Sequence, residues 1–251
     1  MTGLRVAITG AHGRMGKNLC ELVDLADDLV LAARVVEAGQ PSGVTLDQLD
    51  PGQVDVVVDF TTVHATAAIG QWCQAHRKAW VLGTTGLGPE QQAAVDACAA
   101  VAPVFAATNF SIGVALLADL AARAASVLGL DADIEIVETH HRHKQDAPSG
   151  TALTLAHAVA AARGQNLQEV RKDGRVGLVG ERPRGEIGLH AVRTADIVGE
   201  HEVILGWPAE RLRLHHDARD RKVFAHGALR AARWLSSRPA GLYGMKDLLQ
   251  G

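Results

Sequence analysis

Cysteine is scarce in this chain of 251 residues, which contains only Cys20, Cys73 and Cys98. The three are widely spaced and odd in number, so they offer neither a disulfide framework nor the ligand spacing of a structural zinc site. We therefore expect the protein to work in a reducing compartment, the cytoplasm.

A strong net charge and long hydrophobic runs are also missing. The formal net charge is −3 at pH 7, which argues against a protein that binds nucleic acids or anionic membranes by charge. Asp119 and Arg123 interrupt the longest apolar stretch, so we expect no segment with the ~20 apolar residues of a membrane span. The composition, with 47% apolar and 21% charged residues, is that of a globular protein with a real core.

The first hundred or so residues alternate strand patterns with helical patterns. Strands are expected at residues 4–9, 30–36, 54–60, 79–82 and 103–106. Helices are expected between them at residues 19–25, 65–76 and 89–101. Such alternation indicates right-handed crossovers and a parallel sheet with helices on both faces. This part of the chain therefore predicts a Rossmann-like, doubly wound α/β domain.

The pattern changes after about Asn109. Further helices are expected at 113–128 and 149–163, and strands at 134–139, 187–193, 201–206 and 211–217, with a loop at 171–185 and a last helix at 227–235. Strands that follow one another without helices predict a mixed sheet, and hence a smaller α+β domain. The expected domains are 1–110, with a C-terminal return at 226–251, and 111–225.

A glycine-rich loop, Gly10-Ala11-His12-Gly13-Arg14-Met15-Gly16, joins the first strand to the first helix. Glycine permits a tight turn and lets backbone N–H groups approach a pyrophosphate at the helix N-terminus. The spacing departs from the standard GxGxxG because His12 replaces the second glycine. Glu37 ends the next strand, where an acid can bind the ribose hydroxyls of a dinucleotide. We therefore predict a dinucleotide site rather than an ordinary strand-to-helix turn.

Two further loops follow strands of the same domain, at the edge where open α/β sheets bind ligands. They are Gly83-Thr84-Thr85-Gly86 and Ala107-Thr108-Asn109-Phe110. Their small and hydroxylated residues leave room for a flat nicotinamide, and their amide groups can orient its carboxamide. Asp59-Phe60-Thr61-Thr62 ends another strand and can also border the cofactor. Plain turn chemistry would explain the first two segments if the glycine loop were absent.

Cationic residues gather in the segment His140-His141-Arg142-His143-Lys144, which leads to Ser149-Gly150-Thr151 at an expected helix start. Cations and the free N–H groups of a helix start favour a carboxylate ligand. A histidine with an ordinary pKa of about 6.5 can also deliver a proton near neutrality. A solvated loop with a capping serine is one alternative. Zinc binding by His141 and His143 is a weaker one, because the neighbouring arginine and lysine would repel a cation.

Taken in order, these motifs resemble the 4-hydroxy-tetrahydrodipicolinate reductase (dihydrodipicolinate reductase) family of diaminopimelate and lysine biosynthesis. The resemblance spans essentially the whole chain, including residues 196–201 and 224–228, and the sequence HHRHKxDAPSGTA is its most specific part. It implies an NAD(P)H-dependent oxidoreductase that reduces a cyclic dicarboxylate with loss of water. It also implies a homotetramer, joined through the sheets of the second domain.

The resemblance further implies roles for individual residues. His140 and Lys144 become the catalytic pair that supplies or relays a proton. The substrate carboxylates are assigned to His141, Ser149, Gly150 and Thr151. The cofactor is assigned to Gly10, Ala11, His12, Gly13, Arg14, Met15, Glu37, Gly83, Thr84, Thr85, Ala107, Thr108, Asn109 and Phe110. The domain 1–110 is then expected to bind the dinucleotide, and the domain 111–225 the substrate and neighbouring subunits, with no metal.

Two positions depart from the commonest pattern of the family. Ala38 follows Glu37 where many relatives have arginine, which predicts that NADH is favoured over NADPH. Arg14 and Lys17 nevertheless keep the use of both cofactors open. His12 stands at a small or variable position of the glycine loop, and we expect it at the surface near the cofactor without a chemical role.

Two rival functions stay open. One is an amine dehydrogenase that acts on a small diamino acid, which would not need a clamp for two carboxylates. The other is a regulatory module that binds NAD(H) without turnover, and such a module would not need His140 and Lys144.

Overall fold

The computed structural model describes residues 3–251. The chain forms two compact units: the first contains the residues up to Ser111 together with Lys222–Gly251, and the second contains Ile112–Arg221. The C-terminal segment therefore returns to the first unit. The chain changes unit after Ser111 and again at Lys222, whereas the sequence predicted these changes after residue 110 and at residue 226.

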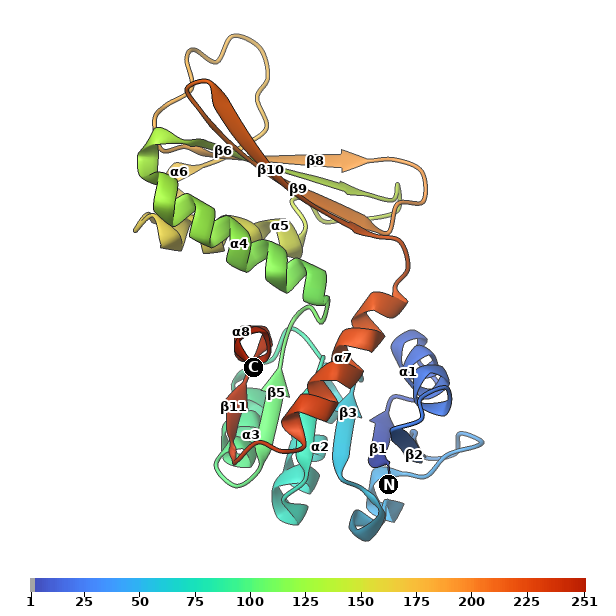
Figure 1. Cartoon of the computed structure of the whole chain (residues 1–251). Helices are drawn as coiled ribbons and strands as arrows, with labels where there is room; N and C mark the ends of the chain where they lie inside the picture. The colour runs from blue at the N-terminus through green and yellow to red at the C-terminus, as the bar shows by residue number, and fades with distance from the viewer. Residues whose placement is uncertain (1–2) are drawn as a thin grey trace. The chain divides into compact units, whose positions relative to one another are not determined.

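Unit 1 is built on a six-stranded parallel sheet in the order β11-β5-β4-β3-β1-β2 (Figure 1). Its strands are β1 (Leu4–Thr9), β2 (Leu29–Val35), β3 (Val56–Asp59), β4 (Ala79–Leu82), β5 (Pro103–Ala106) and β11 (Gly241–Tyr243). The sequence predicted the first five and missed β11. The strand order proceeds from β1 to β2 in one direction and from β3 to β5 in the other. The ends of β1 and β3 therefore flank the switch point where doubly wound sheets bind ligands.

Helices cover both faces of this sheet (Figure 1). One face carries α1 (Arg14–Asp24) and α7 (Lys222–Leu235), and the other carries α2 (Val63–His76) and α3 (Pro89–Ala99), while α8 (Met245–Gln250) ends the chain. Alternate residues of each strand supply the two cores, because successive side chains point to opposite faces. Ala7, Val57 and Trp80, from three neighbouring strands, pack with Ile69 and Cys73 of α2. The doubly wound architecture predicted from the sequence is confirmed.

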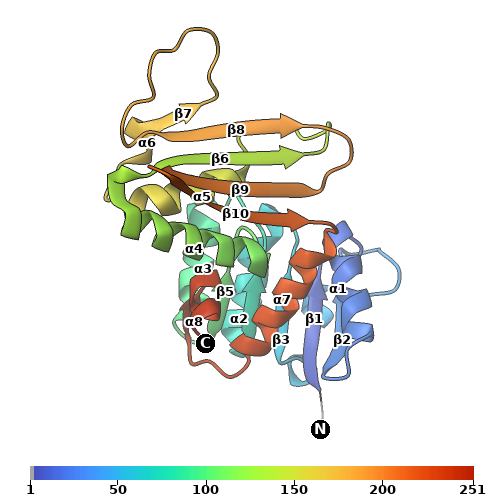
Figure 2. The ribbon, with the colours of Figure 1, turned by 45° about the horizontal axis from the view of Figure 1, so that its top comes forward.

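Unit 2 is built on a five-stranded mixed sheet in the order β10-β9-β6-β8-β7. Its strands are β6 (Asp133–His140), β7 (Arg171–Asp173), β8 (Ile187–Arg193), β9 (Gly199–Trp207) and β10 (Glu210–Ala218). β6 pairs parallel with β8 and antiparallel with β9. Helices α4 (Ile112–Leu128) and α5 (Gly150–Ala162) lie on one face of the sheet (Figure 2). The mixed sheet expected from the sequence is confirmed.

The segment expected as one loop at 171–185 is only partly a loop. Its first three residues form β7, which pairs with β8, and the short helix α6 (Leu167–Val170) precedes it. The charged sequence Arg-Lys-Asp has low strand propensity, so backbone pairing decides its conformation. The remaining loop is tied to the sheet, because Arg175 and Arg182 both donate hydrogen bonds to Glu135, at 2.8 and 2.9 Å from its Oε1 atom.

Helix α4 differs from the expectation that no segment is long and apolar enough to span a membrane. Together with the turn η3 (Gly129–Asp131) it is the one helical segment of residues 3–251 that is long and apolar enough, by length and composition, to cross a membrane. That criterion is also met by core helices of globular proteins. In α4, Leu117, Ala121 and Ala125 are buried in the core of unit 2.

Candidate functional site

The glycine loop makes a turn that other residues could not make. Gly10 has a φ of +67°, and a Cβ there would lie 3.1 Å from the carbonyl oxygen of Phe60. A Cβ on Gly16 would lie 2.1 Å from the carbonyl oxygen of Gly10. The two glycines therefore allow α1 to start directly against the end of β1. The N-cap residue of α1 is Gly13, which has no side chain to bond to the first N–H groups of the helix.

A cavity of about 460 Å³ lies at the ends of β1, β2 and β3. Its lining joins Gly10–Gly13 to Glu37, two features that the sequence placed in one site. Leu46 and Ile69 add apolar walls, while Thr61 adds a hydroxyl group. A cavity with apolar walls, an acid and a glycine loop suits the adenosine part of a dinucleotide.

A second cavity, of about 470 Å³, adjoins the other end of the glycine loop. It is lined by Arg14 and Met15 on one side and by Gly83, Thr84 and Thr85 on the other. A Cβ on Gly83 would lie 2.3 Å from the ring of a phenylalanine, Phe60, so only glycine fits there. The hydroxyl oxygen of Thr84 is buried and has no hydrogen-bond partner among residues 3–251. A ligand group in this cavity would satisfy that hydroxyl.

The segment Ala107–Phe110 lines neither of these two cavities. The N–H of Ala107 donates to the carbonyl of Leu82, which places the segment beside the end of β4. Phe110 is only 2% exposed and packs on the ring of Phe60, with ring centroids 5.3 Å apart. Phe110 is therefore a core residue of unit 1, and a contact of this segment with a cofactor stays a prediction.

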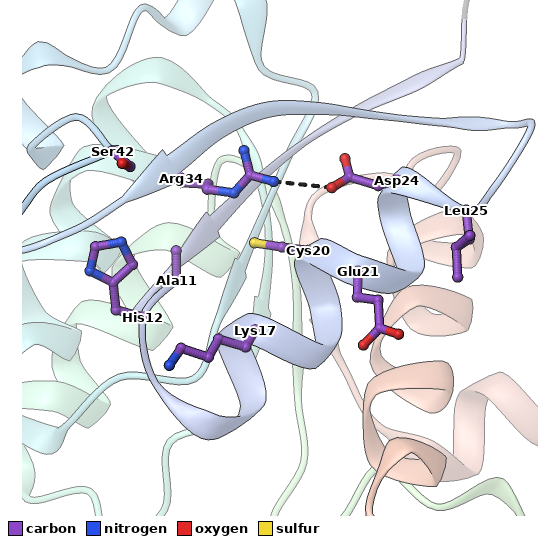
Figure 3. A pocket seen from close by; sticks show the side chains of 9 residues that line it. All are labelled: Ala11, His12, Lys17, Cys20, Glu21, Asp24, Leu25, Arg34 and Ser42. Carbon is purple, nitrogen blue, oxygen red and sulfur yellow. Dashed lines mark hydrogen bonds and ion pairs between the residues drawn. The ribbon is translucent and has the colours of Figure 1, made fainter.

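A third hollow, of about 530 Å³, lies between α1 and β2 on the far side of His12 (Figure 3). Lys17 and Arg34 contribute positive charge to its lining, and Arg34 forms an ion pair with Asp24 at 3.0 Å. Nδ1 of His12 lies 2.8 Å from the side-chain oxygen of Gln40. His12 lines both this hollow and the cavity that contains Glu37, and its position near a cofactor stays a prediction.

In unit 2, the cationic segment connects the end of β6 to the start of α5. His140 is the last residue of β6, and Ser149 caps α5, because its Oγ atom accepts a hydrogen bond from the N–H of Ala152 at 3.1 Å. Gly150 and Thr151 form the first turn of that helix. The structure therefore brings the predicted proton donor and the predicted carboxylate-binding helix start to the same end of the sheet.

Lys144 and His141 lie in the loop between these elements. The ammonium group of Lys144 lies 2.9 Å from both carboxylate oxygens of Asp146. Nη2 of Arg221 lies 3.3 Å from Nε2 of His141. A guanidinium group only donates, so Nε2 is the acceptor and Nδ1 carries the ring proton. This Nδ1 atom is buried and has no partner within the described part of the chain.

Three residues that the sequence did not single out surround His140. Glu138, only 1% exposed, accepts a hydrogen bond from Nδ1 of His140 at 2.5 Å. Arg193 donates to both carboxylate oxygens of Glu138, each at 2.8 Å. His201 packs edge-on against His140, with ring centroids 5.1 Å apart, and its Nε2 lies 3.1 Å from Oγ of Ser149. One signal for Glu138 was available, since residues i and i+2 of a strand share a face.

Burial and charge act in opposite directions on this cluster. Burial lowers the pKa of His140, while the Glu138 carboxylate opposes the shift. Burial also raises the pKa of Glu138, but hydrogen bonds from Arg193 and His140 outweigh it and leave this pKa below its usual value. The pKa of His201 falls to about 3, mainly through burial and then through the charge of His140. Glu138 is therefore ionised and His201 is neutral near pH 7.

Comparisons with known proteins agree on one family. The chain matches the sequence models "Dihydrodipicolinate reductase, N-terminus" over residues 4–110 and "Dihydrodipicolinate reductase, C-terminus" over residues 113–249. It is 45% and 44% identical to 4-hydroxy-tetrahydrodipicolinate reductases of Alkalilimnicola ehrlichii and Saccharophagus degradans, and each alignment covers 98% of both chains. A dipicolinate-bound dihydrodipicolinate reductase from Paenisporosarcina sp. TG-14 has a similar structure. Its TM-score is 0.82 at 26% identity, over 98% of this chain and 99% of the other.

Proposed function

The chain belongs to the dihydrodipicolinate reductase family, and we propose on this premise that it reduces 4-hydroxy-tetrahydrodipicolinate to tetrahydrodipicolinate in diaminopimelate and lysine biosynthesis. The observation that carries the proposal is the meeting of His140, Lys144 and the start of α5 at one end of the unit 2 sheet. A proton donor thus lies beside a binding site for carboxylates. One hydride and one proton are consumed, and one water is released.

The substrate is a dicarboxylate, as is the dipicolinate bound to the related reductase from Paenisporosarcina. One carboxylate would accept hydrogen bonds from the first N–H groups of α5, around Gly150 and Thr151. The buried Nδ1–H of His141, which lacks a partner among residues 3–251, offers another donor. Lys144 adds a positive charge in the same loop. These groups together fix the orientation of the substrate, which hydride transfer requires.

His140 and Lys144 would supply or relay the proton. Hydride addition to a C=C bond conjugated to an imine builds negative charge on nitrogen, and a nearby acid neutralises it. Burial keeps His140 largely neutral in the free protein, since its pKa is lowered. A bound dianion would favour the protonated imidazole, because an opposite charge stabilises the charged form. Substrate binding itself would therefore load His140 with the proton that the reaction consumes.

The residues of unit 1 fit a nicotinamide dinucleotide, which supplies the hydride when it is bound. Glycine is the only residue that fits at positions 16 and 83, and the buried hydroxyl of Thr84 has no hydrogen-bond partner in the described part of the chain. Glu37 lines the adenosine cavity and would bind the ribose hydroxyls. It would also repel a 2′-phosphate, and Ala38 supplies no compensating charge. We therefore propose that both cofactors are used and that NADH is preferred.

Cofactor preference is tested by measuring kcat/KM with NADH and with NADPH on the same preparation. The value should be higher with NADH. The variant Ala38→Arg adds a cation next to Glu37 and should raise the value for NADPH. An equal or higher kcat/KM with NADPH in the unmodified chain would overturn the preference.

A cytoplasmic homotetramer, joined through the sheets of unit 2, is also part of the proposal. Helices α4 and α5 cover one face of the sheet, and the opposite face carries Val137 and Ile204 among charged residues. A second copy of the chain would cover these apolar side chains. Sedimentation equilibrium should give the mass of four chains, and the mass of one chain at micromolar concentration would contradict this assembly.

The proposed activity is tested by nicotinamide absorbance while the substrate is generated enzymatically in the same cuvette. We expect NADH oxidation that requires both this protein and the substrate. A dehydrogenase of diamino acids would instead reduce NAD⁺ when given the diamino acid. A regulatory module would bind NADH without oxidising it. Either of these two results would refute the proposal.

A further inference from the structure

Glu138 is a buried carboxylate whose hydrogen-bonding capacity is almost fully used. Its Oε2 atom accepts from Nδ1 of His140 at 2.5 Å and from Arg193 at 2.8 Å. Its Oε1 atom accepts from Arg193 at 2.8 Å and from the backbone N–H of Ser149 at 3.1 Å. A buried carboxylate persists only when such partners compensate for its lost hydration. One side chain thus holds the proton donor and the start of α5 together.

This arrangement determines which nitrogen of His140 faces the reaction. Glu138 and His140 stand two residues apart on β6 and share one face of the sheet. Since an ionised carboxylate only accepts, Nδ1 must carry a proton. In the neutral ring the Nε2 atom is then free to take up and return the reacting proton. Nε2 lies beside Gly199, where the absence of a Cβ leaves space next to it.

We propose, on the premise of the proposed function, that Glu138 is a positioning residue for the reaction. It fixes His140 in the tautomer with Nδ1 protonated, and it fixes the spacing between Nε2 of His140 and the carboxylate-binding start of α5. Arg193 supports it by neutralising its charge and by donating a hydrogen bond to the carbonyl oxygen of Asp146, at 2.7 Å. The proton donor and the substrate clamp therefore move as one body.

The charged groups around His140 give the carboxylate a second effect. Glu138 on the same strand favours the protonated ring, while Lys144 in the following loop and Arg193 on β8 oppose it. His201 on β9 stays neutral, because burial lowers its pKa to about 3. Glu138 is thus the one carboxylate among these neighbours. Without it, protonation of His140 should require a lower pH.

A purely structural role for Glu138 is the alternative, and the chain provides a matched control for it. Glu135 lies on the same strand and also binds two arginines, Arg175 and Arg182, and a histidine, His190, whose Nε2 is 2.6 Å from Oε2 of Glu135. This second cluster lies on the opposite face of the sheet. Loss of Glu135 should therefore disturb β6 to a similar degree without touching His140.

The test is ¹⁵N NMR of the histidine rings in the full chain, with the signal of His140 assigned by its loss in His140→Gln. In the wild-type chain and in Glu135→Gln, neutral His140 should carry its proton on Nδ1. In Glu138→Gln the ring should become a mixture of tautomers or switch to Nε2, and its titration midpoint should move to lower pH. An unchanged tautomer and midpoint in Glu138→Gln would overturn the proposal.

Kinetics give a second readout. Glu138→Gln should lower kcat at least about 10- to 100-fold, the range found when a carboxylate that orients a metal-binding histidine is removed, while Glu135→Gln keeps the wild-type kcat. If Glu138→Gln does not fold, Glu138→Asp takes its place, because its shorter carboxylate stays charged beside Arg193 but withdraws from Nδ1. Wild-type kcat and tautomer in the folded variant would contradict positioning. The NMR result needs no turnover, so it separates failure of this inference from failure of the proposed function.

Discussion

Gly199 lies directly against the imidazole ring of His140: a Cβ at position 199 would be 2.9 Å from Nε2 and 3.3 Å from Cδ2 of that ring. Real Cβ atoms essentially never approach so closely, and the ring cannot yield freely because Glu138 holds its other nitrogen. Gly199, the first residue of β9, therefore leaves room for Nε2 of His140 because it has no side chain.

Gly199→Ala should consequently displace the ring and lower kcat by ~10- to 100-fold, because misplacement of a catalytic group by about 1 Å has effects of this order. Gly206→Ala is the control, since it lies on the same strand and a Cβ there meets nothing within 4 Å. Steady-state kinetics and thermal unfolding of both variants check the prediction. Equal kcat values for the two variants would contradict it.

His140→Gln and Lys144→Ala should each depress kcat by ~10²–10⁴-fold, the usual range for groups that transfer protons. The double variant should lose little more than the worse single variant if the two residues serve one proton transfer. Near-native turnover in either single variant would remove that residue from the catalytic pair.

Thr151→Val tests the start of α5 as a carboxylate site. Thr151 is half-buried in the first turn of the helix, so its loss should raise KM for the substrate more than it lowers kcat. Thr154→Val is the control, because the hydroxyl of Thr154 is exposed and bonds to the carbonyl of Gly150 within the helix. A fall in kcat at unchanged KM in Thr151→Val would argue against substrate binding.

Stability should depend on pH through His201. Its pKa falls from an ordinary 6.5 to about 3 in the folded chain, so between these values the unfolded chain binds more protons. The contribution of neutral His201 to the free energy of unfolding is therefore fully present above pH 6.5. It falls by about 1.4 kcal/mol per pH unit as the pH decreases toward 3. Urea unfolding between pH 5 and 7 should show a shallower pH dependence for His201→Asn. Identical slopes in the two proteins would contradict a neutral, buried His201.

Much of the fold follows from local patterns. β1, β4, β5 and β8 match their predicted residues because each is a short apolar or β-branched run. Helix α1 begins at Arg14, five residues before its expected start at residue 19, since its first turn belongs to the glycine loop. The edge strands β7 and β11 were not predicted, because three residues carry no periodicity and their pairing partners are distant in sequence.

The residues of the candidate site could likewise be predicted only where they stand in contiguous motifs. Gly10, Glu37 and His140 were predicted because each stands in a segment with its own signature. Arg193 and His201 could not be found in this way, since each meets the cluster only through the pairing of β6 with β8 and β9. They follow His140 by more than fifty residues, and although His201 stands in the segment 196–201 that carried part of the resemblance, nothing in that segment assigned it to this cluster.

Transfer of deuterium tests the central claim most directly. NADH deuterated at both C4 positions is incubated with this protein and enzymatically generated 4-hydroxy-tetrahydrodipicolinate, and the product is examined by mass spectrometry. We expect tetrahydrodipicolinate that carries one deuterium, formed in amounts equal to the NADH oxidised, and almost none with His140→Gln. Product without deuterium, or no product from the wild-type chain, would contradict the account.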